Sequence, residues 1–243
     1  MIVNTKNQIS YILTLSLSIF LVGCQSNKAT EETDTKESET ASGWLPENYR
    51  PKNQKIFMLA DSALQLQTAA IMDPTLAIAD REQKLKAAFS LLTTANELDP
   101  KYGVIYSNMA AIYLEFGDTL GAIDKMRQRL ELEPELAEGW QAMGFFYDKM
   151  GDSTKAFSFY QKSIEHFDAR LALGKKYSNP QDVVYYYDNM AGKAYSLLLL
   201  GKTADSHATV HNMLDEAALI LGEDAGAYAA LLTMNRWTML ESQ

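Results

Sequence analysis

Apolar and small residues recur with a period of 34 along the middle of the chain. Positions 4, 7, 8 and 11 of the period are three or four residues apart, which places their side chains on one stripe of an α-helix. The small residue at position 8 lets a second helix approach closely, and the glycine at position 15 provides a turn. Each period is therefore predicted to form two packed helices, A and B. Positions 4, 7, 8, 11, 15, 20, 24 and 32 are Tyr106, Met109, Ala110, Tyr113, Gly117, Ala122, Met126 and Pro134 in one copy, and Trp140, Met143, Gly144, Tyr147, Gly151, Ala156, Tyr160 and Asp168 in the next.

Weaker copies of the pattern flank these two. Upstream, a helix B is predicted over about 81–98 and a longer first helix over about 52–71, because Asp73-Pro74 interrupts a helix between them. Downstream, a fourth copy follows an insertion over 174–180, whose Asn179-Pro180 suits the start of a helix. Its helix B is predicted over about 203–221, and a terminal helix over about 224–240. The fourth copy is in register at Met190, Ala194, Leu197, Gly201, Ser206 and, as a poor fit, Lys193.

The second copy reads W-x2-M-G-x2-Y from Trp140 to Tyr147, which resembles the W-x2-L-G-x2-Y signature of the tetratricopeptide repeat (TPR). Asp168 departs from the family pattern, which has proline at that position. The resemblance covers about residues 69–220 and implies an all-α fold, a TPR-type α-solenoid of about four helix pairs plus a terminal helix. The implied repeats are about 69–102, 103–136, 137–170 and 187–220, within a folded region of 51–243.

In this family, helices A line a concave groove that takes up a peptide or a helix of a partner protein. The lining here is apolar and weakly acidic, which suits an amphipathic segment or an aromatic anchor. The lysine and asparagine clamp of chaperone-binding members is absent from the lining positions. The alternative is that these residues pack against the insertion or the terminal helix. The candidate groove residues are Val104, Ser107, Ala111, Leu114, Glu138, Gln141, Phe145, Asp148, Asp188, Ala191, Tyr195 and Leu198.

Residues 1–23 have the character of a secretory signal peptide. Lys6 is their one charged side chain, and the apolar run 9–23 would span roughly 22 Å as a helix, less than the roughly 30 Å of a bilayer core. Leu21-Val22-Gly23-Cys24 resembles the lipobox of bacterial lipoproteins, in which the cysteine is acylated and begins the mature chain. Residues 24–50 are predicted to be this lipidated cysteine and a disordered acidic linker. The alternatives are an uncleaved anchor or a cysteine that occurs at this position by chance.

Composition and side-chain chemistry argue against other classes of function. A net charge of −9 disfavours nucleic acid as a partner, because phosphate contacts need Lys and Arg. No catalytic residue, cofactor or metal is predicted, although His207 and His211 are four residues apart, a spacing that two metal ligands can use. Glu131 and Glu133 are predicted to be surface charges. The tyrosines 185–187 point about 100° apart on a helix, which favours core packing for at most two of them.

The sequence therefore predicts a membrane-anchored TPR lipoprotein that acts as a protein-protein interaction adaptor or assembly factor in the bacterial envelope. Its partner is expected to be another protein or a peptide segment, with no nucleic acid and no small-molecule substrate. Gln25 after the cysteine favours the outer membrane, facing the periplasm, by resemblance to other lipoproteins. The alternatives are a metal-assisted periplasmic hydrolase that uses His207 and His211, and a passive structural lipoprotein.

Overall fold

The structure is a computed structural model that describes residues 51–173, 180–221, 226–236 and 240. Regular structure within these ranges is helical, and no strand occurs in them. The all-α fold of TPR-type helix pairs is thereby confirmed. The predicted signal peptide, Cys24, the linker and most of the insertion, including Asn179, lie outside the described residues.

The described helices belong to two compact units that divide in sequence between Pro134 and Glu135. The first unit contains α2 (Gln54–Met72), α3 (Ile78–Leu98), α4 (Val104–Glu115) and α5 (Thr119–Leu132). The second unit contains α6 (Ala137–Lys149), α7 (Ser153–Ala172), α8 (Pro180–Leu199), α9 (Thr203–Leu221), α10 (Gly226–Ala229) and the 3-10 helix η4 (Ala230–Thr233).

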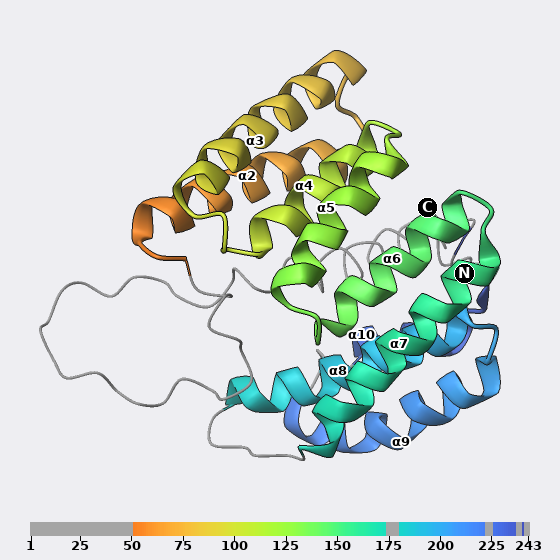
Figure 1. Ribbon diagram of the computed structural model, residues 1–243. Helices are drawn as coiled ribbons and strands as arrows, with labels where there is room; N and C mark the ends of the chain where they lie inside the picture. The colour runs from red at the N-terminus through yellow and green to blue at the C-terminus, as the bar shows by residue number, and fades with distance from the viewer. Residues whose placement is uncertain (1–50, 174–179, 222–225, 237–239, 241–243) are drawn as a thin grey trace, which may run out of the picture. The chain divides into compact units, whose positions relative to one another are not determined.

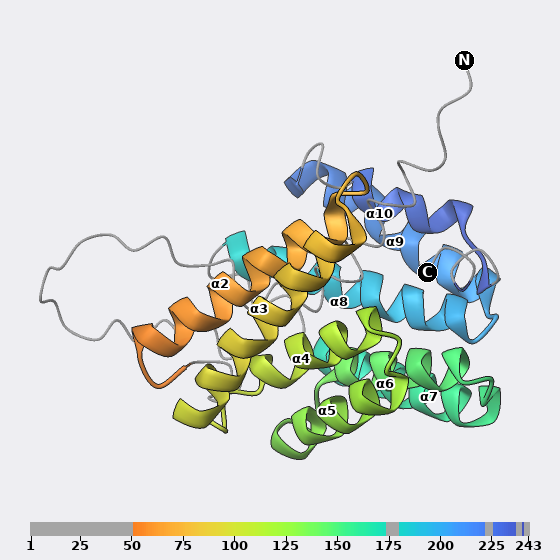
Figure 2. The same cartoon turned by 90° about the horizontal axis from the view of Figure 1, so that it is seen from above.

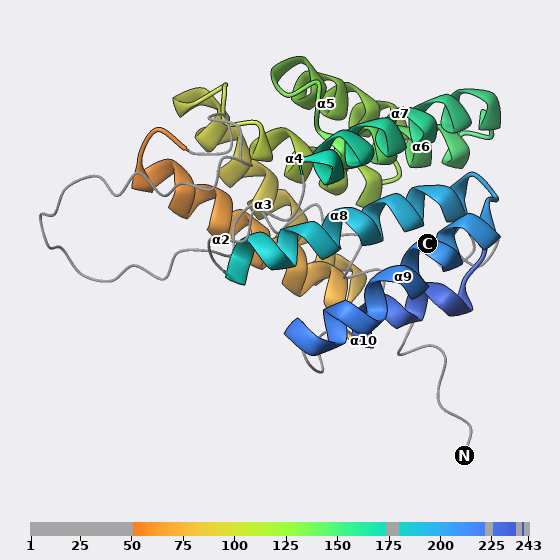
Figure 3. The same ribbon diagram turned by 90° about the horizontal axis from the view of Figure 1, so that it is seen from below.

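Within each unit, successive helices form antiparallel pairs. Figures 1 and 2 show α2 beside α3 and α6 beside α7, and Figure 3 shows α8 beside α9. In the second unit α7 also packs against α8, so that one pair lies on the next. The described chain thus holds the four predicted helix pairs, α2/α3, α4/α5, α6/α7 and α8/α9.

The turn inside three of the pairs is built in the same way. Gly117, Gly151 and Gly201 have φ values of 76°, 79° and 77°, in the left-handed region that favours glycine. The amide of each following residue donates to the carbonyl five residues back, as Asp152 does to Tyr147 at 2.9 Å. This is the Schellman arrangement that ends a helix. The turn predicted from the glycine at position 15 is therefore confirmed.

Close approach of the helices depends on small side chains at the predicted positions. A Cβ atom added to Gly144 would lie 2.5 Å from the ring of Tyr160, which is too close for any real Cβ. Ala110, Ala122 and Ala156 are buried at the matching positions. The missing side-chain volume lets α6 contact the fully buried Tyr160 of α7 directly.

Two departures from the repeat pattern pair with each other. The ammonium group of Lys193, the poor fit at position 7 of the fourth copy, lies 2.5 Å from the carboxylate of Asp168. Asp168 occupies the position where the family has proline, at the end of the preceding repeat. This ion pair joins α7 to α8 and gives both departures one physical explanation.

The first unit contains a buried ion pair that the sequence did not suggest. Arg129 Nη2 lies 2.7 Å from Glu133 Oε2, and their side chains are only 3% and 1% exposed. The prediction that Glu133 is a surface charge is wrong. Both side chains lie against Gly103, where an added Cβ would come within 2.5 Å of Glu133 Oε1. The pair therefore fixes the end of α5 against the start of α4.

The helix predicted over about 224–240 is not continuous. α10 and η4 together cover 226–233, and Met234 follows with φ −109° and ψ 157°, an extended conformation that ends the helical path. Residue 236 is helical again. On the two sides of this break, Tyr228 contacts Asp188 of α8 and Arg236 contacts Asp148 of α6.

Candidate protein-binding site

The predicted groove residues divide between the two units. In the first unit, Val104 and Ser107 of α4 are buried, whereas Ala111 and Leu114 are partly exposed. In the second unit, the groove residues of α8 are buried or nearly so, with Tyr195 8% exposed and Leu198 fully buried. The contacts that bury them come in part from the C-terminal segment, defined here as residues 226–236.

Asp148, at the end of α6, is the polar centre of this face. Its side chain is 2% exposed. The Tyr160 hydroxyl donates to Asp148 Oδ2 at 2.8 Å, and the Ser153 hydroxyl lies 3.3 Å from Oδ1. Burial raises the pKa of the Tyr160 hydroxyl, and the neighbouring Asp148 carboxylate raises it further. Tyr160 therefore stays a neutral donor, and α7 holds the carboxylate of α6 in a fixed orientation.

Arg236 of the C-terminal segment binds at this carboxylate. Its Nη2 donates to Asp148 Oδ1 at 2.7 Å, and its Nη1 donates to the main-chain carbonyl of Leu199, the last residue of α8. The guanidinium carbon also lies 4.6 Å from the centre of the Phe157 ring, a cation–π distance. Three elements of the second unit, α6, α7 and α8, thus contribute to one arginine site.

Tyr228 forms the second polar contact of the C-terminal segment. Its hydroxyl donates to Asp188 Oδ1 at 2.7 Å. Burial raises the pKa of the Asp188 carboxyl, and the nearby Glu138 raises it too, although the hydroxyl of Tyr228 works in the opposite direction. Asp188 is consequently a buried acceptor whose charged form is stabilised by the hydrogen bond from Tyr228.

Apolar side chains of the segment complete the contact. Tyr228, Leu231 and Met234 are 5%, 7% and 8% exposed. They belong to one hydrophobic cluster with residues of α7, α8 and α9, including Tyr187, Tyr195, Leu198 and Val210. In the second unit the chain's own terminal segment therefore packs on the predicted groove residues, which is the alternative that the sequence left open.

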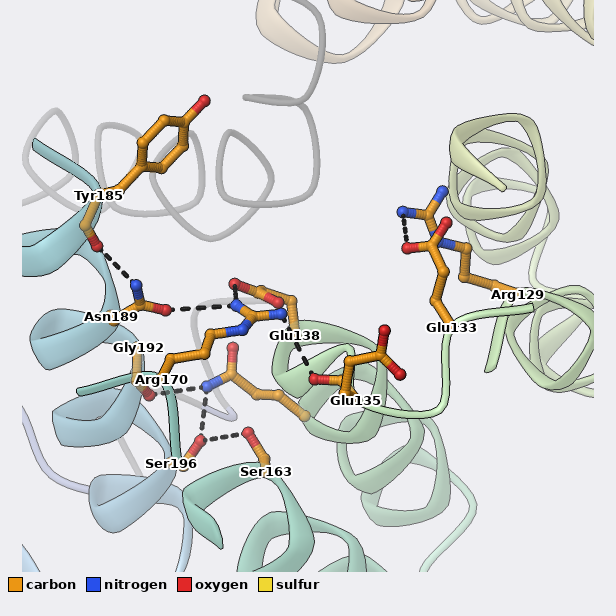
Figure 4. A network of polar contacts seen from close by, with 11 residues as sticks. Arg129, Glu133, Glu135, Glu138, Ser163, Arg170, Tyr185, Asn189, Gly192 and Ser196 are labelled. Atoms are coloured by element: carbon orange, nitrogen blue, oxygen red, sulfur yellow. Dashed lines mark hydrogen bonds and ion pairs between the residues drawn. The ribbon is translucent and has the colours of Figure 1, made fainter. Parts of the chain in front are cut away.

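Two other groove residues tie the helices of the second unit together. Gln141 Nε2 donates to the Gly192 carbonyl at 3.0 Å and to the Ser196 hydroxyl at 2.7 Å, so that α6 is bonded to α8. Glu138 accepts from Arg170 of α7 at 2.7 Å, and the same arginine donates to Asn189 of α8 at 3.2 Å. Figure 4 shows Arg170 between Glu138 and Asn189. This network fixes the relative positions of α6, α7 and α8, and hence the geometry of the face.

A ribbon of stacked rings lies between α6 and α7. The ring centres of Tyr147 and Phe159 are 5.3 Å apart, those of Phe159 and Trp140 are 5.9 Å apart, and His166 follows at 6.3 Å from Trp140. Lys162 lies over the Trp140 ring at 4.3 Å. Burial and the charge of Arg170 lower the pKa of His166. Trp140 and Tyr147, the aromatic residues at positions 4 and 11 of this repeat, therefore serve in packing inside one helix pair.

The other residues singled out in the sequence are the tyrosines 185–187 and the histidines 207 and 211. Tyr187 is fully buried, and Tyr185 and Tyr186 are partly buried, in agreement with the core-packing hypothesis. His207 Nε2 lies 3.3 Å from the Met234 carbonyl, whereas His211 is exposed. In the described part of the chain, no three His, Cys, Asp or Glu side chains gather as a metal site would require. Among the described helices, none is long and apolar enough to cross a bilayer.

Sequence reasoning missed Arg236, although a signal for it exists. From Gly226 to Leu240 the chain reads GAYAALLTMNRWTML, in which Arg236 is the one charged residue. If such an apolar stretch packs on the fold, its single charge needs an acidic partner. Asp148 was already a candidate groove residue, so this pairing could have been proposed.

No known family profile matches the chain as a whole or in part. A heat shock protein sti1 homolog from Schizosaccharomyces pombe is 32% identical over 93 residues, which are 37% of this chain and 16% of that protein. A small glutamine-rich tetratricopeptide repeat-containing protein 2 from Mycosarcoma maydis is 30% identical over 79 residues, 32% of this chain and 22% of that protein. An Hsp70-Hsp90 organizing protein from Triticum aestivum is 28% identical over 137 residues, 53% of this chain and 24% of that protein.

The chain thus spans at most 24% of the length of these curated relatives. One of them is named for its tetratricopeptide repeats. The described part of this chain is built of helix pairs, with glycine turns in three of them and small residues at the expected positions. Sequence similarity and structure together support the assignment of these helix pairs to the tetratricopeptide type.

Proposed function

We propose that this protein is a protein-protein interaction adaptor or assembly factor, held at a bacterial membrane by lipid on Cys24. One observation carries the binding part of the proposal: helices α6 and α8 hold a peptide-like segment through an arginine site, a tyrosine contact and an apolar cluster. A face that binds its own segment in this way has the chemistry to bind a protein ligand. The name of one relative, an Hsp70-Hsp90 organizing protein, describes a protein that organises two others.

A binding role without catalysis fits the chemistry of the described residues better than hydrolysis does. The carboxylates with resolved partners are engaged in ion pairs, helix caps or hydroxyl contacts, as Asp148 and Asp118 are. His211 is exposed on α9, and His207 contacts the main-chain carbonyl of Met234. The metal-assisted hydrolase therefore gains no support from the arrangement of these residues.

The proposed location of the protein in the cell envelope rests on the sequence. The apolar run 9–23, the lipobox-like Leu21–Cys24 and the acidic residues up to 43 are consistent with export, acylation and a solvated tether. We propose the outer membrane, facing the periplasm, as the location. A Cys24→Ser protein should appear in the soluble envelope fraction. Membrane retention equal to that of the parent protein would refute the lipid anchor.

Crosslinking in intact cells followed by mass spectrometry tests the adaptor role. The parent protein should recover one heterologous protein reproducibly, with crosslinks to the second unit. A matched control is Arg127→Gln, which changes an exposed arginine of the first unit and should not alter the recovery. If repeated experiments recover no reproducible partner, the passive structural lipoprotein would replace the adaptor.

A further inference from the structure

We propose that the C-terminal segment is an internal ligand, and that a partner protein displaces it with a segment of the same chemistry: a tyrosine, apolar side chains three and six residues later, and an arginine eight residues after the tyrosine. The spacing is that of Tyr228, Leu231, Met234 and Arg236. This inference rests on the proposed function, because it names the kind of protein segment that the adaptor would bind.

Side chains, rather than regular secondary structure, hold the C-terminal segment in place. α10 and η4 have four residues each, and Met234 is extended, so the segment has no helix long enough to be stable by itself. Its polar anchors are Tyr228 on Asp188 and Arg236 on Asp148. Contacts of this kind can be exchanged for equivalent ones from another chain without refolding the helices beneath.

The arginine site is preorganised by residues other than its arginine. Tyr160 and Ser153 donate to Asp148 from α7, and these contacts do not involve the C-terminal segment. Phe157 is also on α7, and 40% of it is exposed even with the segment in place. Since departure of Arg236 would leave Asp148 oriented and negatively charged, the site would keep its preference for a cation.

The charges of the C-terminal segment and of the face beneath it are complementary. Asp188 and Asp148 on the receptor side are carboxylates, and the Tyr228 hydroxyl and the Arg236 guanidinium that contact them are donors. A partner segment with an acidic residue in place of the arginine would bring two buried negative charges together, which is strongly unfavourable. The face therefore selects an arginine-bearing aromatic segment and rejects an acidic one.

With an internal ligand, the apparent affinity for a partner equals the intrinsic affinity multiplied by the fraction of molecules in which the face is free. Weakening the segment should therefore strengthen binding in trans. The test uses the full chain in detergent and a fluorescent peptide with the sequence of residues 224–240, with binding followed by fluorescence anisotropy. Arg236→Gln should bind this peptide at least about tenfold more tightly than the parent does. Arg127→Gln, the same change at an exposed site, should bind as the parent does.

Peptide variants keep the test independent of protein folding. Peptides carrying the equivalents of Tyr228→Phe and Arg236→Gln should each bind the Arg236→Gln protein at least about tenfold more weakly than the unchanged peptide. Equal binding of the changed and unchanged peptides would overturn the proposal, and so would equal affinities of the parent and Arg236→Gln proteins. Formation of dimers by Arg236→Gln in light scattering, in place of peptide binding, would also overturn it, because a second copy would then be the occupant.

The two proposals fail in different ways. If cells yield a reproducible partner whose affinity is the same for the parent and Arg236→Gln proteins, the adaptor role stands and the internal-ligand proposal fails. If the peptide binds as predicted but no partner is recovered, the segment is a displaceable internal ligand, whereas the adaptor role fails and displacement by a partner protein fails with it.

Discussion

At the scale of single residues, the same side-chain type has opposite energetic roles in the two units. Gln67 of α2 is 1% exposed, and neither its amide oxygen nor its amide nitrogen has a hydrogen-bond partner in the structure. Gln141 of α6 is also buried, at 4% exposed, but its nitrogen donates to Gly192 and Ser196. A buried amide without a partner costs free energy, whereas one with good partners contributes to stability.

This contrast predicts opposite effects of one substitution. Gln67→Met should raise the free energy of unfolding by about 1 kcal/mol, because it removes an unpaired amide and keeps the side-chain length. Gln141→Met should lower it by about 1–2 kcal/mol, because the hydrogen bonds of Gln141 to the Gly192 carbonyl and the Ser196 hydroxyl are lost. Urea denaturation followed by circular dichroism measures both. Destabilisation by Gln67→Met would mean that this amide is bonded after all.

Asp188 should give the second unit a specific pH dependence. Its pKa is raised in the folded state by burial and by Glu138, so the folded protein binds this proton more tightly than the unfolded chain does. The stability that protonation provides is complete below the ordinary carboxyl value of 3.8 and is lost as the pH rises through the raised value. Asp188→Asn keeps an oxygen that accepts from Tyr228 but cannot ionise. It should therefore gain stability relative to the parent as the pH rises.

Unfolding free energies of the parent and Asp188→Asn proteins, measured from about pH 4 to about pH 8, check this expectation. The difference between the two should grow in favour of Asp188→Asn over the window above 3.8. Asp215→Asn, at an exposed position of α9, is the matched control. Parallel curves for parent and Asp188→Asn would show that Asp188 does not carry the pH dependence.

At the scale of elements, the helix pairs could be predicted because their signals are local. Gly151 is followed by Asp152, whose side chain accepts from the Lys155 amide at 3.1 Å and caps α7, so turn and cap lie within a few residues. The bounds of α9, Thr203–Leu221, agree with the predicted 203–221 for the same reason. The C-terminal segment could not be predicted in this way, because Arg236 and Asp148 are 88 residues apart in sequence and Tyr228 and Asp188 are 40 apart.

The glycine turns allow a clean test of backbone conformation. Gly151 has φ 79°, and an added Cβ would have no atom within 4 Å, so that Gly151→Ala introduces strain without a steric clash. We expect a loss of about 1 kcal/mol in the free energy of unfolding. Gly226 is also in open space but lies at the start of α10 without a positive φ. Gly226→Ala should leave stability unchanged or raise it slightly, and thermal unfolding of the two variants distinguishes them.

At the scale of the whole molecule, the apolar residues of the C-terminal segment both stabilise the core and have to leave it when the segment is displaced. Tyr228, Leu231 and Met234 contribute to the cluster of the second unit, and each buried apolar side chain of this size contributes about 1.5–3 kcal/mol. The free energy lost when these side chains are displaced must be offset by burial of the partner's side chains. An unliganded face should therefore be open to solvent and locally less stable.

Hydrogen exchange of a protein shortened to end at residue 221 measures this cost. Amides of α8 and α9 should exchange faster than in the full chain, because their cluster loses the three side chains, while amides of α2 and α3 serve as an internal reference. Adding the 224–240 peptide should restore slow exchange in α8 and α9, because the peptide supplies the same arginine, tyrosine and apolar contacts in trans. Unchanged exchange after truncation would mean that the segment contributes little to the core. Faster exchange that the peptide does not restore would mean that the segment is a fixed part of the fold, which no partner could replace.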